Sequence, residues 1–195
     1  MKHINLTTKK RQMKIKILEK VAGCMPEIIK VGDWVDLMTA EEYTFKCPHA
    51  KMLHKQKNEE EKKIDRYRDV MFTYGLMELG VAMQLPKGYE AIVAPRSSTF
   101  KKWGIMESNS MGIIDGSYCG NDDTWKFPCI ATRNITIPKG TPICQFRIQL
   151  SQKATMWQKI KWFFSSKIEL VKVDNLDGEN RGGIGTGSDK YRTKQ

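Results

Sequence analysis

The chain has 195 residues, which suits one domain with additions, and 40% of its residues are hydrophobic. Its mean hydropathy of −0.50 is compatible with a globular core that carries charged insertions. No apolar run reaches the length of a membrane span and the first residues lack a signal-peptide pattern, so we expect a cytoplasmic protein. The five cysteines include no CxxC pair, and we interpret them as reduced thiols.

The net charge of +11 admits two interpretations. A basic surface can attract nucleic acid, or it can steer a small polyanion such as a nucleoside triphosphate. Alternatively, much of the excess lies in solvated segments. Lysine and arginine crowd the regions 9–16, 51–68 and 153–167, which favours the second interpretation for part of the charge.

The N-terminal half begins with a polar, basic segment, 1–12, which we expect to be frayed. The first strand pattern starts at Met13 and alternates apolar and basic residues, and a turn leads into another strand at 32–37. The region 46–68 is dense in charge and poor in branched apolar residues, so we predict an exposed insertion, partly helical.

A metal site inside this insertion is the less favoured hypothesis. Cys47, His49 and His54 lie within it, but their spacing matches no standard zinc pattern and a fourth ligand is missing.

The region 70–150 has a different texture, in which short apolar runs alternate with glycine, proline, asparagine and aspartate. Regularly spaced short strands separated by turn signals are typical of a sandwich, a jelly roll or a barrel. A final strand is predicted at 168–173.

A helical pattern interrupts the strands at 152–167. One helix face would hold Met156, Trp157, Ile160, Phe163 and Phe164, and Trp162 falls off that face. We expect the apolar face to pack on the body of the protein or on a neighbouring subunit. A membrane-surface helix and a partner-binding helix are the alternatives.

The central stretch 91–120 carries the chemistry. It contains a turn with one arginine and two serines at 95–99, which suits a phosphate group, and an apolar run that ends in Asp115. Tyr118 follows three residues later. An isolated carboxylate at the end of a buried strand suits a water molecule or a hydroxyl group. Together these features indicate an enzyme that acts on a phosphorylated small molecule.

Five segments in this order resemble the motifs of the trimeric dUTPase family, most closely its phage and prophage type. They are Gly-Asp-Trp-Val-Asp-Leu at 32–37, Pro-Arg-Ser-Ser at 95–98, Asn-Ser-Met-Gly-Ile-Ile-Asp-Gly-Ser-Tyr-Cys-Gly at 109–120, Gly-Thr-Pro-Ile-Cys-Gln at 140–145 and Arg-Gly-Gly-Ile-Gly-Thr-Gly at 181–187. The second and third segments are the specific ones.

The resemblance implies an all-β fold, a distorted jelly roll (β-clip) spanning 13–176, with the charged insertion 46–68 and one short amphipathic helix in 152–167. A flexible glycine-rich arm, 177–195, would close over the active site. The resemblance further implies a homotrimer with shared active sites. The reaction would be dUTP plus water to dUMP plus pyrophosphate, which limits uracil in DNA and supplies dUMP for dTMP synthesis. Mg²⁺ would bind through the triphosphate, with no direct protein ligand.

The resemblance also assigns roles to residues. Asp115 would be the general base, and Tyr118 would press its ring on the deoxyribose and exclude a 2′-hydroxyl. Asn109 and the backbone of Met111 and Gly112 would pair with uracil in a closed strand hairpin. The phosphate-binding residues would be Ser97, Ser98, Gln145 and Arg181, and Arg96 would structure the site by pairing with Asp36, which would also reach the hydrated metal. The arm would cover the base with Ile184, Gly185 and Thr186.

Two departures from the family pattern affect these roles. Ile184 stands where the family usually has an aromatic residue, so it covers the base without stacking, and we expect looser substrate binding. The first motif is reshaped, which bears on Asp36.

Two alternative functions are weighed against this prediction. A dCTP deaminase shares the fold, but it needs a glutamate shortly after Gly120, and the segment 121–139 has none. A regulator of the same fold could bind a repressor or nucleic acid through its inserted elements. The intact Asp115 and Tyr118 favour catalysis, and we do not expect nucleic-acid binding, although the insertions could bind a protein partner.

Overall fold

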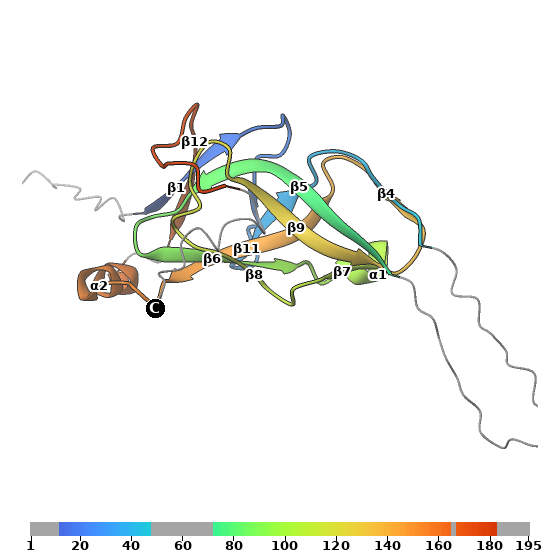
Figure 1. The fold of residues 1–195 in the computed structure, drawn as a ribbon. Coiled ribbons are helices and arrows are strands. Elements are labelled where there is room, and N and C mark those ends of the chain that lie inside the picture. Colours follow the sequence, from blue (N-terminus) through green and yellow to red (C-terminus); the bar gives the residue numbers. More distant parts are fainter. Residues whose placement is uncertain (1–11, 48–71, 165–166, 183–195) are drawn as a thin grey trace, which may run out of the picture.

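The computed structural model describes residues 12–47, 72–164 and 167–182. The predicted segments 1–11, most of the charged insertion, and the arm beyond Gly182 lie outside the described residues. Two stacked five-stranded sheets and a two-stranded ribbon make up almost all of the fold (Figure 1). The all-β prediction is therefore confirmed.

The first sheet contains the longest strand of the chain, flanked by strands from both ends of the sequence. Its order is β12 (Ile168–Lys172), β1 (Met13–Glu19), β5 (Thr73–Gln84), β9 (Thr124–Ala131) and β7 (Ile105–Glu107). The pairing of β1 with β12 is parallel, and the other pairings are antiparallel.

The second sheet carries most of the predicted site. Its order is β2 (Glu27–Ile28), β3 (Val35–Met38), β11 (Pro142–Leu150), β6 (Tyr89–Pro95) and β8 (Gly112–Ile114). The separate ribbon pairs β10 (Ile135–Ile137) with β4 (Tyr43–Phe45). The strands predicted at 13–18, 32–37 and 168–173 correspond to β1, β3 and β12.

The core forms where the two sheets face each other. Alternate residues of β9 are fully buried, as expected for a strand with one face inward. Trp125 of this strand meets Phe146 of β11 edge-on, with 5.2 Å between ring centroids. This contact joins the two sheets at the centre of the apolar cluster.

Gly80 interrupts the long strand β5. The pairing register with β9 shifts between Glu78 and Ala82, and Gly80 has φ of +68°. Its carbonyl accepts hydrogen bonds from the amides of Lys20 and Val21. A side chain here would be strained, and its Cβ would lie 2.7 Å from Cys24 Sγ. The glycine therefore lets the chain after β1 pack closely against β5 at the point where its register with β9 shifts.

Helix α2 (Met156–Phe164) confirms the predicted helical insertion, but its apolar face does not pack on the body of its own chain, and packing on a neighbouring subunit stays a prediction. Trp162 is the aromatic residue that packs inward, with its ring centroid 5.4 Å from that of Tyr89. Trp157 and Phe163, by contrast, are 80% and 81% exposed. The helical period identified the apolar face of α2 correctly. It could not show that the rest of the protein contacts the side of the helix that carries Trp162.

A second, shorter helix, α1 (Thr99–Trp103), follows the arginine–serine turn and was not predicted. At five residues it is too short to show a helical period. It ends at Gly104, which has the left-handed conformation that favours glycine at a helix end.

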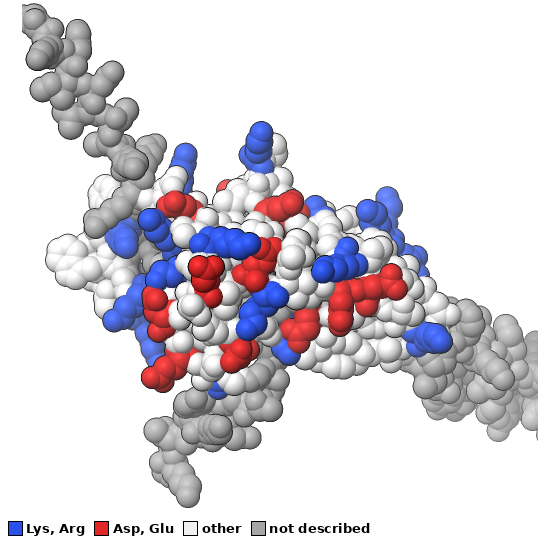
Figure 2. All heavy atoms as spheres, turned by 90° about the horizontal axis from the view of Figure 1, so that it is seen from above, with Lys and Arg blue, Asp and Glu red and all other residues white. Residues whose placement is uncertain are grey.

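The surface of the described residues carries charges of both signs. In Figure 2, lysine and arginine interleave with aspartate and glutamate over the face that is shown. Lysine and arginine outnumber acidic residues only slightly among the described residues, so most of the net charge of +11 comes from the other segments. No described helix is long and apolar enough to cross a membrane.

Candidate active site

The arginine–serine turn sits at the end of β6, beside β11 and β3. Arg96 Nε lies 3.0 Å from Oδ1 of Asp36, so the predicted ion pair is present. Asp36 is 4% exposed. Burial raises the pKa of Asp36, and the charge of Arg96 partly offsets this.

The other phosphate-binding candidates lie next to this ion pair. Ser97 and Ser98 are exposed, and Ser98 is the N-cap residue of α1 without using its hydroxyl as a cap. Gln145 pairs in register with Asp36 on one side and Ala94 on the other, and its side-chain amide donates to the Pro95 carbonyl at 3.4 Å. The phosphate half-site is the set Asp36, Arg96, Ser97, Ser98 and Gln145.

Asp115 follows β8, and its carboxylate is about half exposed. One oxygen accepts hydrogen bonds from the Ser117 amide, at 2.9 Å, and from the Ser117 hydroxyl. The other oxygen is paired with the guanidinium of Arg181. Partial burial acts to raise the pKa of Asp115, but the bonds from Ser117 and Arg181 outweigh it, and the pKa lies below its ordinary value.

Tyr118 lies just beyond, at the edge of the core. Its side chain is 8% exposed, and its hydroxyl donates to the Thr124 carbonyl at 2.9 Å. Burial, reinforced by the charge of Asp123, raises the pKa of Tyr118 to about 12, so the phenol stays neutral. The carboxylate half-site is the set Asp115, Tyr118 and Arg181.

The predicted uracil-binding segment forms a tight turn rather than a strand hairpin. The Met111 amide donates to the Asn109 carbonyl at 2.6 Å, and Ser110 between them has φ of 63°. The flanking strands belong to different sheets, because β7 pairs with β9 and β8 pairs with β6. The hairpin prediction was therefore wrong: the turn passes the chain from one sheet to the other, and Asn109 and Met111 are exposed on it.

Glu107 is half-buried at the base of this turn, with both carboxylate oxygens hidden from solvent. Neither of its carboxylate oxygens has a hydrogen-bond partner among the described residues. Burial raises the pKa of Glu107 to about 7, and the nearby Gly112 amide offsets only part of this. The folded state therefore keeps a proton that the unfolded chain releases near pH 4.5, and its stability falls as the pH rises from there to about 7.

Glu107→Gln is expected to remove this pH dependence. The variant should match the wild type near pH 4 and be more stable at pH 8, by up to about 2 kcal/mol after allowance for partial exposure. Thermal unfolding at both pH values measures the difference. Equal stability at pH 8 would contradict an ionised, unpartnered Glu107.

The two half-sites lie at opposite ends of the same pair of strands. Ile114 pairs with Ala91 in an antiparallel register, so Asp115 lies level with residue 90. That residue is six positions along the chain from Arg96. At about 3.3 Å per residue this is a separation of about 20 Å. One α-phosphate cannot contact both half-sites of a single chain.

The first residues of the arm lie on their own chain, and they are held by a residue that sequence reasoning missed. Asp123 is fully buried, and its carboxylate accepts hydrogen bonds from the amides of Gly120, Arg181 and Gly182. The signal was present: Asp123 is in phase with the inward residues Trp125 and Phe127 of β9, which predicts burial of a carboxylate. The predicted arm residues Ile184, Gly185 and Thr186 lie outside the described residues.

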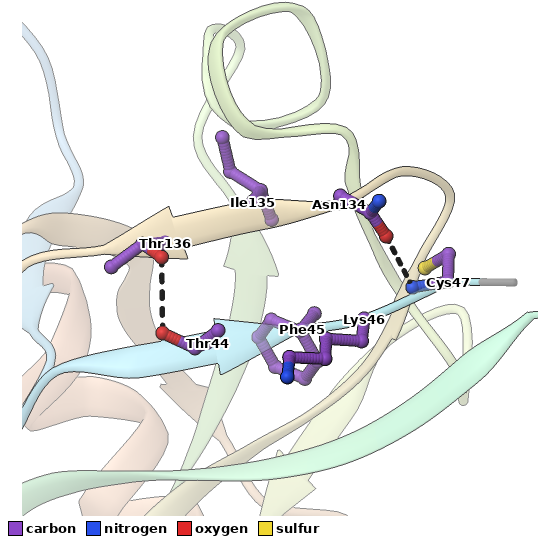
Figure 3. Close-up of a pocket in the computed structure, with 7 residues that line it drawn as sticks. All are labelled: Thr44, Phe45, Lys46, Cys47, Asn134, Ile135 and Thr136. Carbon is purple, nitrogen blue, oxygen red and sulfur yellow. Dashed lines mark hydrogen bonds between the residues drawn. The ribbon is translucent and has the colours of Figure 1, made fainter.

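A surface pocket lies elsewhere, on the ribbon of β4 and β10 (Figure 3). The Cys47 amide donates to Asn134 Oδ1 at 2.7 Å, and the hydroxyls of Thr44 and Thr136 are 3.0 Å apart. None of its lining residues belongs to either half-site. The Cys47 thiol donates to the Ala131 carbonyl at 3.1 Å, and the other two zinc-ligand candidates lie outside the described residues.

Comparisons with known proteins identify the family of the chain. The family model described as dUTPase matches residues 65–160. The SPbeta prophage-derived deoxyuridine 5'-triphosphate nucleotidohydrolase YosS of Bacillus subtilis (strain 168) is 38% identical over 175 residues, which cover 90% of this chain and 96% of that protein.

Solved structures show the same fold at low sequence identity. The dUTPase from Streptococcus mutans aligns with a TM-score of 0.54 at 16% identity, over 74% of this chain and 99% of that one. A dUTPase mutant from phage phi11 of S. aureus, described as coordinating a structural Mg(II) ion, gives 0.52 at 14% identity, over 73% of this chain and 94% of that one.

The fold places an arginine–serine turn and a fixed carboxylate at opposite ends of one strand pair. With the extent of the match to the B. subtilis protein, the chain belongs to the dUTPase family.

Proposed function

We propose that the protein hydrolyses dUTP to dUMP and pyrophosphate. The observation that carries the proposal is the fixed, partly exposed Asp115 carboxylate next to buried Tyr118, in a chain of the dUTPase family. The family relatives described above are deoxyuridine triphosphate nucleotidohydrolases. The deaminase alternative is not favoured, because Asp123, the buried carboxylate after Gly120, is occupied by backbone amides rather than free to act as a base.

In this mechanism Asp115 orients a water molecule and takes its proton as the water oxygen attacks the α-phosphorus. The bond from the α-phosphorus to the bridging oxygen breaks, and pyrophosphate leaves. One oxygen of this carboxylate is held by Ser117, which orients Asp115 to accept the proton. Tyr118 would form the floor against which the deoxyribose packs, leaving no space for a 2′-hydroxyl.

The phosphate half-site would bind the triphosphate. The exposed hydroxyls of Ser97 and Ser98 are free to donate to phosphate oxygens, and Arg181 would exchange Asp115 for the γ-phosphate. Asn109 and the backbone of Met111 and Gly112 would contact the uracil from the exposed turn.

Mg²⁺ fits as a partner of the triphosphate. The phosphate oxygens of the substrate would supply the hard oxygen ligands that Mg²⁺ prefers. The carboxylate of Asp36, which is paired with Arg96, could also accept a hydrogen bond from a water molecule on the ion. When bound, the ion would neutralise charge on the phosphates.

We further propose that the active protein is a homotrimer, in which the phosphate half-site of one copy meets the carboxylate half-site of another. The separation of about 20 Å between the half-sites of one chain supports this, because a single α-phosphate must contact both.

The unpaired thiols of all five cysteines support an origin in the reducing cytoplasm.

Incubation of the purified protein with dUTP, dCTP and UTP tests the function. We expect pyrophosphate from dUTP and none from UTP. Ammonia from dCTP would indicate the deaminase instead, and no product from any of the three would favour the regulator.

A further inference from the structure

We propose that Asp123 is a positioning residue, which fixes the arm root (residues 176–182) so that the guanidinium of Arg181 is held at the catalytic carboxylate. The inference rests on the proposed function, since it assigns how that site acquires its phosphate-binding arginine. Asp123 touches no part of the predicted ligand and would act only through Arg181.

The hydrogen bonds of Asp123 join two segments that are far apart in the sequence. Within the turn 120–123, the Gly120 amide donates a hydrogen bond to Asp123 Oδ2 at 2.9 Å. The Arg181 amide lies 3.0 and 2.9 Å from the two oxygens, and the Gly182 amide donates to Oδ1 at 3.1 Å. Hydrogen bonds from backbone amides to a carboxylate are stronger than those between neutral groups.

The arm root also runs in close contact with the segment that precedes Asp123. A Cβ on Gly120 would lie 2.2 Å from Asn180 Oδ1 and 2.5 Å from the backbone nitrogen of Asn180. A Cβ on Gly178 would lie 2.3 Å from Cys119 Sγ. Two glycines at facing positions let the backbones approach, so this course of the arm is specified by the sequence.

Neighbouring side chains repeat the same connection. The Leu176 amide donates to Asn121 Oδ1 at 2.8 Å, and Asn180 exchanges two hydrogen bonds of 2.8 Å with Asp122. Asp123 differs from these in being fully buried and in binding the backbone of Arg181 itself. Its carboxylate therefore sets the point from which the Arg181 side chain extends to Asp115.

A double-mutant cycle tests this coupling. In Asp123→Asn the new side-chain NH₂ faces amide donors, so we expect kcat/KM for dUTP to fall by about tenfold or more. Arg181→Ala should lower it at least as much. If Asp123 acts through Arg181, adding Asp123→Asn to Arg181→Ala should change kcat/KM by less than about twofold. Additive losses would overturn the proposal and assign Asp123 a general role in stability.

The matched control is Asp177→Asn. It removes a carboxylate from the same arm root, where Asp177 pairs with Lys16 in an exposed position, and we expect kcat/KM to stay within about twofold of the wild type. If Asp177→Asn lowered kcat/KM as much as Asp123→Asn does, the loss would come from removing a negative charge and the positioning role would be overturned. If the wild type releases no pyrophosphate from dUTP, the proposed function fails; an active wild type with an unaffected Asp123→Asn overturns only the positioning role.

A measurement on the unmodified protein covers the case in which Asp123→Asn does not fold. Hydrogen exchange should show protected amides at Arg181 and Gly182 in the ligand-free wild type, since both are bonded to a buried carboxylate. Exchange of both amides at the rate of an unstructured peptide would overturn the proposal.

Discussion

Asp115→Asn is expected to lower kcat for dUTP hydrolysis by about 10²- to 10⁴-fold, the range typical of losing a general base. The amide cannot take a proton from the attacking water. Binding should persist, because the substitution removes a negative charge near a triphosphate and leaves Tyr118 and the phosphate half-site unchanged. Single-turnover kinetics, with a binding titration against a non-hydrolysable dUTP analogue, separate the two effects.

Two further variants sharpen this result. Asp174→Asn removes an exposed carboxylate outside the site and should leave kcat unchanged. Ser117→Ala removes one hydrogen bond that lowers the pKa of Asp115, so the acid limb of the pH–rate profile should move upward, towards the ordinary carboxyl range. Substantial turnover by Asp115→Asn would rule out Asp115 as the base.

Mixing two inactive variants is expected to restore activity. Ser98→Asp places a carboxylate among the phosphate-binding groups and should abolish binding, while aspartate remains a favourable N-cap for α1. Asp115→Asn inactivates the carboxylate half-site. If each site combines half-sites from two copies, a 1:1 mixture of co-expressed chains has both intact halves in about one site in four, and about a quarter of wild-type activity should return.

Ser98→Asn is the matched control for charge, because it removes the same hydroxyl and still caps the helix without adding a carboxylate, so it should lose less activity than Ser98→Asp. Co-purification through distinct tags verifies that mixed oligomers have formed. Mixed oligomers without activity would mean that both half-sites act within one chain, contrary to the separation inferred from the pairing of β6 with β8.

The sequence was most informative where local pattern and burial coincide. The alternation in β1 and β9 and the turn residues between strands predicted the β fold, and the Asp36–Arg96 ion pair followed from the resemblance. Each of these features involves residues within one strand, or residues that lie close together because their strands belong to the same sheet.

The remaining features depend on contacts that no local pattern specifies. The apolar face of α2 does not cover the body of its own chain, because amphipathicity shows which residues share a face and not what lies next to that face. The uracil turn was predicted as a hairpin because its two flanking strands are close in sequence, yet they pair in different sheets. The role of Asp123 required knowing that the arm root returns to its turn.

The parallel pairing of β1 with β12 has a consequence for the order in which the protein can be completed. β1 leaves the ribosome early and pairs with β5, but its other edge stays open until the last described strand has been made. Such long-range closure is slow and leaves an unpaired edge in the incomplete chain. The arm root follows β12 directly, so the arginine of the active site is synthesised only after the strand that covers this edge.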